Sequence, residues 1–176
     1  GATDGMLRVL YHNAMDVLSL VGVATQVLGR HRQDDPSQLS ASEALAVGRW
    51  HQRAGRIDPA EQALRSAAGS SDGELHLEAL RRLAEYLKRG GRVAEALGAW
   101  AEWHDRAPSD PIPCIELAKY FEWEARDPVQ ATFWTQEALG ALRHWPDDWR
   151  RDEAAARFGH RRERLRGKMP DAAGAA

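Results

Sequence analysis

Residues that favour β-strands are scarce in this sequence, and the shortage limits the folds open to it. Val, Ile and Thr together number 15 among 176 residues, whereas alanine alone numbers 30. β-branched side chains are enriched in strands, and alanine is the strongest helix former. The composition therefore predicts a nearly all-α protein.

Charge and cysteine content exclude several classes of protein. The formal net charge is −2, so bulk charge identifies no partner. The single cysteine, Cys114, excludes a disulfide framework, and the seven histidines have no zinc-ligand spacing. We expect Cys114 to be a small buried residue outside any Cys–His nucleophile pair. The longest apolar run, residues 17–28, is interrupted by polar residues and is shorter than the roughly 20 residues of a membrane span. We expect no membrane association and a cytoplasmic location.

The first 30 residues predict one long helix. Apolar residues recur at intervals of three and four from Leu7 to Leu28, and Gly29 is a plausible end. Residues 31–41 are polar and aperiodic, which indicates a linker. We expect the helix either to pack on the helical hairpin that follows or to pair with another chain, because a bare apolar stripe is costly to hydrate.

From residue 42 onward the sequence divides into short helical segments separated by Gly or Pro. The predicted helices are 43–54, 59–68, 74–89, 93–106, 113–125, 129–143 and 149–166. Helix breakers recur at 55–57, 90–93 and 125–128, a period of about 35 residues that is typical of helical-hairpin arrays. Residues 170–176 predict a flexible tail.

The second hairpin carries the clearest repeat pattern. Its spaced residues are Leu80, Leu83, Ala84, Leu87, Gly91, Ala96, Trp100, Trp103 and Pro108. This pattern resembles the tetratricopeptide repeat (TPR), and the hairpins on either side match it more loosely. The resemblance implies a right-handed array of three TPR-like hairpins over 42–146, closed by a capping helix over 147–169.

The segment from Tyr11 to Leu20, YHNAMDVLSL, carries a second motif. It resembles the last helix of ribonuclease-H-like (DnaQ-like) 3′–5′ exonucleases of the YprB type, in which a TPR region follows the nuclease domain. The resemblance implies that residues 1–30 are the terminal helix of a truncated nuclease domain. It also implies that Asp16 is a ligand of Mg²⁺ or Mn²⁺ and that His12 is the general base or positions the attacking water.

This nuclease assignment has limits that follow from the chemistry. His12 and Asp16 are four residues apart, so they share a helical face, which is also a common arrangement on solvated helices. Asn13 is open to the same plain surface interpretation. One carboxylate cannot hold two divalent metals, and residues 1–10 cannot contain the Asp-x-Glu strand and the second Asp of the nuclease core. We therefore expect this chain to hold no cofactor and to be inactive by itself.

Tryptophans and a basic run are the candidate partner contacts. We expect Trp100 and Trp103 to be core residues, and Trp123, Trp145 and Trp149 to lie at the surface or cap. Arginine and lysine dominate residues 157–168. Such a run either contacts phosphates or is simply a solvated face near a helix end. The candidate partner-binding residues are Trp123, Trp149, Arg161 and Arg162.

Two functions remain open from the sequence. The first is the C-terminal part of a metal-dependent exonuclease, whose repeats bind a protein segment or position nucleic acid. The second is a non-enzymatic adaptor that binds a protein segment in its repeat groove. The fold alone does not distinguish them.

Overall fold

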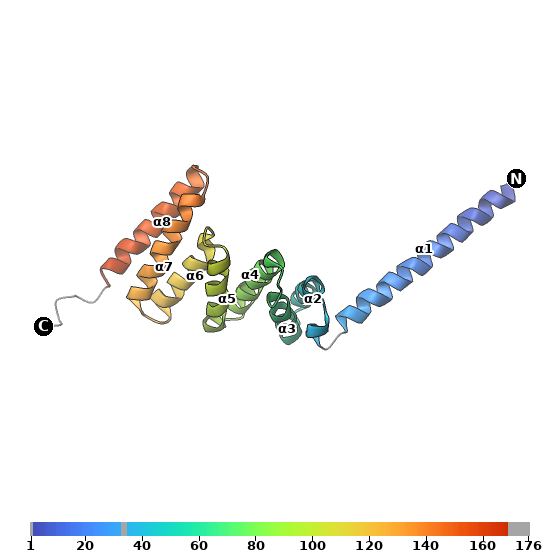
Figure 1. Cartoon of the computed structure of the whole chain (residues 1–176), viewed down its shortest axis with the longest axis horizontal. Coiled ribbons are helices and arrows are strands. Elements are labelled where there is room, and N and C mark those ends of the chain that lie inside the picture. Colours follow the sequence, from blue (N-terminus) through green and yellow to red (C-terminus); the bar gives the residue numbers. More distant parts are fainter. Residues whose placement is uncertain (1, 33–34, 169–176) are drawn as a thin grey trace. The chain divides into compact units, whose positions relative to one another are not determined.

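The computed structural model describes residues 2–32 and 35–168, and all of its regular structure in these ranges is helical (Figure 1). The prediction of an all-helical protein is confirmed for these residues. The chain separates into two compact units, Gly1–Ala67 and Ala68–Ala176.

The first unit begins with a long helix. Its elements are α1 (Ala2–His31), the short 3-10 helix η1 (Pro36–Gln38), α2 (Ala41–Arg53) and α3 (Ile57–Ala68). Gly29 does not end α1, because the Arg32 amide still donates to the carbonyl oxygen of Leu28, at 3.0 Å. A helical glycine costs only about 1 kcal/mol relative to alanine, too little to stop a helix of this length.

The predicted linker is partly structured and leads into α2. Leu39 is buried, and the Ser66 hydroxyl of α3 donates to the Pro36 carbonyl oxygen at 3.0 Å. Ser40 then caps α2 in a reciprocal box with Glu43. The second half of residues 31–41 is therefore attached to the helices that follow it.

Helices α2 and α3 approach closely at a glycine. A Cβ atom added to Gly48 would lie 3.0 Å from Leu64 Cδ2, and the Leu64 side chain is fully buried. The small residue at this position lets the two helices pack against each other.

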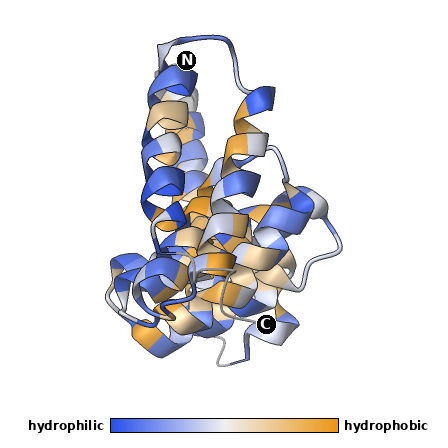
Figure 2. Ribbon diagram, turned by 90° about the vertical axis from the view of Figure 1, so that its left-hand side faces the viewer, coloured by the Kyte–Doolittle hydropathy of each residue, from blue (hydrophilic) through white to orange (hydrophobic). Residues whose placement is uncertain are grey.

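The second unit is a series of helices in which each one packs on its neighbour in the chain. Its elements are α4 (Gly73–Arg89), α5 (Val93–Arg106), α6 (Pro111–Trp123), α7 (Pro128–Ala141), η2 (Leu142–His144) and α8 (Trp149–Arg166). Aspartate caps four of the helix N-termini, at Asp72, Asp110, Asp127 and Asp148. Hydrophobic and hydrophilic residues alternate along the packed helices (Figure 2).

Left-handed residues turn the chain between the helices of each successive pair. They are Gly55 (φ 69°), Gly91 (φ 74°) and Arg126 (φ 53°). At the first turn the Arg56 amide donates to the carbonyl oxygen of His51, and at the second the Arg92 amide donates to that of Leu87, which is the Schellman pattern of helix ends. The period that the sequence indicated is thus visible in the backbone.

The apolar positions of the second hairpin pattern are buried as expected. They are Leu80, Leu83, Ala84, Leu87, Ala96, Trp100 and Trp103. Trp100 and Trp103 are therefore core residues, as predicted. Pro108 is exposed.

Helix α8 closes the second unit against α7. A core cluster of Cys114, Ala138, Leu142 and Phe158 joins α6, α7, η2 and α8, with Trp134 and Trp145 packed at its edge. Leu165, near the end of α8, is fully buried. The burial of Cys114 confirms the expectation from sequence.

Candidate functional site

The His12 and Asp16 side chains lie on one face of α1, as their spacing predicts. His12 Nε2 is 3.5 Å from Asp16 Oδ2, and the two side chains are 78% and 59% exposed. The geometry leaves both groups accessible from solvent.

The acids around this pair do not form a metal centre in the described part of the chain. Among residues 2–32 and 35–168, no group of three or more His, Cys, Asp or Glu side chains is placed to hold a metal ion. Mg²⁺ requires near-octahedral oxygen ligands, and Asp16 supplies one carboxylate. The two-metal site that the exonuclease resemblance implies does not fit these residues alone, so we derive no catalytic step through it.

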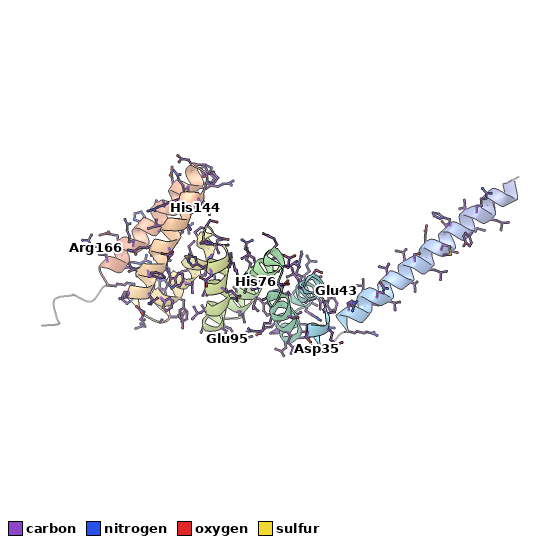
Figure 3. The ribbon with its side chains drawn as sticks, viewed as in Figure 1. Asp35, Glu43, His76, Glu95, His144 and Arg166 are labelled. Atoms are coloured by element: carbon purple, nitrogen blue, oxygen red, sulfur yellow. The ribbon has the colours of Figure 1, made fainter. Side chains whose placement is uncertain are left out.

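Apolar side chains cover most of the circumference of α1, and a polar stripe that includes His12 and Asp16 covers the rest. Val9 follows Leu7 by two residues and so lies about 200° around the helix, while Leu18 lies three turns along on the same side as Leu7. All side chains from residue 5 to residue 30 are exposed and project on every side (Figure 3). The large hydrophobic ones are Met6, Leu7, Val9, Leu10, Tyr11, Met15, Val17, Leu18, Leu20, Val21, Val23, Val27 and Leu28.

Only the end of α1 contacts the hairpin that follows. Arg30 Nε lies 3.0 Å from Glu43 Oε1 of α2. The expectation that α1 packs its apolar side chains on the first hairpin is therefore wrong for the described residues. The other expectation, pairing with a second chain, stays a prediction. None of the described helices is both long enough and apolar enough to cross a membrane.

A buried carboxylate holds α8 on α6. Glu122 lies in the last turn of α6 and its side chain has no exposed surface. Arg164 donates to it through two nitrogens, Nε to Oε1 and NH2 to Oε2, each at 2.8 Å. Lys168 Nζ is 3.1 Å from Oε1, and Arg161 NH1 is 3.3 Å from Oε2. Three cations therefore surround one carboxylate.

The protonation states follow from this arrangement. Burial by itself raises the pKa of Glu122, but hydrogen bonds from Arg164 and Lys168 outweigh it and hold the pKa below its ordinary value. The hydrogen bond to Glu122 raises the pKa of Arg164, and burial lowers that of Arg161. The ion cluster stays charged at neutral pH and carries more positive than negative charge.

Trp123 lies next to this cluster at the surface. Its side chain is 58% exposed, with Lys168 Nζ 4.7 Å and Arg164 Cζ 5.4 Å from the ring centroid. A pocket of about 350 Å³ opens beside it, lined by Glu122, Trp123, Arg126, Pro128, Leu165 and Lys168. Aromatic, apolar and cationic groups thus converge on one cavity.

The structure brings together only some of the predicted partner-binding residues. Trp123 and Arg161 both belong to the surroundings of Glu122, and the Arg161 side chain is only 16% exposed. Arg162 is exposed on α8. Trp149 is 67% exposed but begins α8, so it lies about 20 Å along the helix from Arg162.

Two charged residues of the pocket, Glu122 and Arg126, were not predicted from the sequence. Nothing local marks Glu122, whose cationic partners follow it by 39 to 46 positions. Arg126 did carry a signal, because it stands at the third repeated turn where the first two turns have Gly55 and Gly91. A non-glycine residue at such a position is a reason to look for a function.

Cys114 contacts a histidine that the sequence did not associate with it. Cys114 Sγ lies 3.1 Å from His104 Nδ1, and His104 Nε2 lies 3.8 Å from Glu137 Oε2. Burial raises the pKa of Cys114 to about 12, so the group is a thiol and not a nucleophile. The sequence predicted no Cys–His nucleophile pair, and this contact is not one.

Comparisons with known proteins give one informative similarity. No protein-family model matches the chain, and no solved structure matches it. The chain is 30% identical over 127 residues to "Uncharacterized protein YprB" of Bacillus subtilis (strain 168). That match covers 70% of this chain and 30% of the length of the Bacillus protein. The chain is therefore similar to YprB over most of its own length and corresponds to less than a third of that protein.

Proposed function

We propose that this chain is the C-terminal part of a longer, metal-dependent exonuclease of the YprB type. In this proposal α1 is the last helix of the nuclease domain, and the helices that follow form TPR-like hairpins that bind a protein segment or position nucleic acid. The observation that carries the proposal is the exposure of the wide apolar face of α1.

The apolar face of α1 takes up more than half of its circumference, which is wider than the stripe of an ordinary surface helix. A simple dimer seam would need an apolar stripe on one side, whereas Leu7 and Val9 face nearly opposite directions. The surface that would cover α1 is therefore more extensive than one neighbouring helix. A nuclease domain that packs around α1 would supply it.

The similarity to YprB agrees with this interpretation. Most of the length of that relative lies outside the matched region. A longer protein of this kind has room for the strands that carry the remaining acids. Asp16 would then be one metal ligand among several, and the neighbouring His12 would orient the attacking water. Both roles are what the exonuclease resemblance implies.

Two observations support TPR-like hairpins. Left-handed residues recur at the turns, at 55, 91 and 126. Small residues are buried where the paired helices meet, and they are Gly48, Ala60, Ala84, Ala96, Ala118 and Ala131. Within the second unit, α5 also packs on α6, so the second and third hairpins are joined. Such repeats serve as binding surfaces in many proteins.

The experiment uses the longer protein encoded by the gene. Purified protein is incubated with single-stranded DNA and RNA labelled at either end, in Mg²⁺ or Mn²⁺. We expect shortening of the strands from one end, and Asp16→Asn should reduce the rate by at least about 100-fold because a metal ligand is lost. Asp105→Asn is the matched control, since Asp105 is an exposed aspartate on α5. His12→Ala should also reduce the rate, with His160→Ala as its control.

Two results would overturn the proposal. One is a gene product without an acid-bearing strand region upstream of α1. The other is an Asp16→Asn protein with unchanged metal-dependent cleavage. An adaptor would instead bind a protein segment, and that binding would survive Asp16→Asn and fail when the repeat groove is altered.

A further inference from the structure

We propose that the pocket beside Trp123 binds one nucleotide of a single-stranded nucleic acid. The base stacks on the Trp123 indole, and Lys168 and Arg126 contact the adjoining phosphate. The inference assigns a ligand class to a site far along the chain from His12 and Asp16. Its choice of nucleic acid over peptide rests in part on the proposed function.

The Trp123 indole is exposed and held in one orientation. Trp100 and Trp103 are almost completely buried, whereas Trp123 leaves 58% of its surface exposed. Lys168 and Arg164 lie close to its ring and restrict its orientation. An indole held in place at the surface is a stacking platform, and every nucleic-acid base offers a flat face to it.

The surroundings of the indole carry a net positive charge. Glu122 neutralises only one of the three cations that contact it. Lys168 has three N–H donors and uses one of them on Glu122 Oε1, so two can reach a ligand. Arg126 adds a further cation at the pocket wall. The cavity therefore attracts an anionic group such as a phosphate.

The backbone of Arg126 adopts a conformation that is unusual for a residue with a side chain. Its φ of 53° lies in the left-handed region, where glycine is at ease and a side chain is not. Gly55 and Gly91 occupy the equivalent turns of the other hairpins. An arginine that keeps this conformation at the wall of a pocket suggests that its side chain is needed there.

The remaining walls favour a base over an acidic peptide. Pro128 and Leu165 give the pocket an apolar lining, and its volume of about 350 Å³ suits a nucleotide. A peptide carboxylate would use the cations but not the indole. The base would use Trp123 and the apolar lining, and the phosphate would use the cations. Glu122 also lines the cavity, but it is already paired with Arg164 and Lys168.

The test measures binding of a fluorescein-labelled single-stranded oligothymidylate to the 176-residue chain by fluorescence anisotropy. We expect Trp123→Ala to weaken binding by about tenfold or more, since base stacking on an aromatic ring contributes roughly 1–3 kcal/mol. Trp123→Phe should retain most of the affinity. Trp50→Ala is the matched control, because Trp50 is also an exposed indole with an arginine, Arg56, over its ring but lines no part of the pocket.

Phosphate contact is tested through salt dependence. Affinity falls as salt rises, so the slope of log affinity against log salt is negative. Lys168→Ala and Arg126→Gly should each make this slope less negative by about 0.7 for each lost phosphate contact. The control Arg143→Ala should leave the slope unchanged, because Arg143 is exposed on η2 and lines no part of the pocket. Arg126→Gly should also raise the thermal midpoint while it weakens binding, and this opposite movement separates a lost contact from a damaged fold.

Two results would overturn the inference. One is unchanged affinity in Trp123→Ala. The other is competition by polyglutamate as effective as that by the unlabelled oligonucleotide, which would indicate an acidic polypeptide ligand. The binding assay needs no nuclease activity. If Trp123→Ala loses binding and Asp16→Asn keeps cleavage, the proposed nuclease function is rejected and the nucleotide site stands. If Trp123→Ala keeps binding and Asp16→Asn loses cleavage, only the nucleotide site is rejected.

Discussion

Glu122 and Arg164 form a two-point ion pair that joins α6 to α8, with both nitrogen–oxygen distances at 2.8 Å. The two residues are 42 positions apart in the chain. This geometry matches the planar guanidinium to the planar carboxylate and so fixes the direction of α8 as well as its attachment. It explains how a helix that is polar on most faces docks firmly on its neighbours.

Glu122→Gln should destabilise the second unit by about 2 kcal/mol. The substitution removes the one negative charge among three cations, and breaking a buried pair from one side leaves the other charges uncompensated. Urea denaturation followed by circular dichroism measures the change in unfolding free energy. Glu163→Gln is the control, since Glu163 is 73% exposed and its pairing with Arg166 should contribute less than about 0.5 kcal/mol. Equal effects of the two substitutions would contradict the assignment.

Stability should fall as the solution is acidified, and Glu122 should account for part of the fall. Its pKa in the folded chain is lower than the ordinary 4.5, so folding favours the ionised form. The resulting stabilisation is complete above the unfolded pKa and is lost as the pH falls below about 4.5 and through the folded pKa. Urea midpoints between pH 7 and pH 3 should therefore drop less steeply in Glu122→Gln than in the parent chain or in Glu163→Gln.

Gly91→Ala and Gly98→Ala should change stability in opposite directions. Gly91 has a φ of 74°, where a Cβ is strained, so alanine should cost about 1 kcal/mol. Gly98 lies within α5 with open space where a Cβ would stand, so alanine should add about 0.5–1 kcal/mol. Thermal melts of the two variants check both signs. A stabilising Gly91→Ala would rule out the left-handed turn.

Cys114 should be unreactive in the folded chain. It has no exposed surface, and burial raises its pKa to about 12, so almost no thiolate is present at neutral pH. A thiol reagent such as Ellman's reagent should label it only after urea unfolds the chain. Rapid labelling under native conditions would show that the core between α6 and α8 opens easily.

Local signals were enough to predict much of the fold. The sequence placed α5 at 93–106 and α8 at 149–166, and the structure has the same bounds. Helix periodicity and the turn glycines are short-range features, so they can be read without knowledge of distant contacts. The α6 start was predicted two residues late, because prolines there fit the first turn of a helix.

Features that depend on distant residues were not predictable in this way. Glu122 resembles any surface glutamate until Arg164 and Lys168 fold back on it. His104 and Cys114 are on different helices, and only packing brings them within 3.1 Å. For α1, the sequence showed a stripe from Leu7 to Leu28, whereas the complete set of apolar residues covers most of the helix and leaves a polar stripe at His12 and Asp16. The stripe suggested a partner on one side, and the wider apolar face requires a partner that reaches around the helix.

The wide apolar face of α1 also determines where a longer protein of the proposed kind would tolerate a break. In a longer chain, cleavage after His31 would leave α1 with the domain that covers it and would release the hairpins with their own core. Cleavage before Ala2 would instead leave the hairpins attached to an apolar helix with no cover, and would leave the other domain with an exposed apolar cavity. Both products of that second cut would aggregate, so we expect proteases to yield stable fragments only from the first.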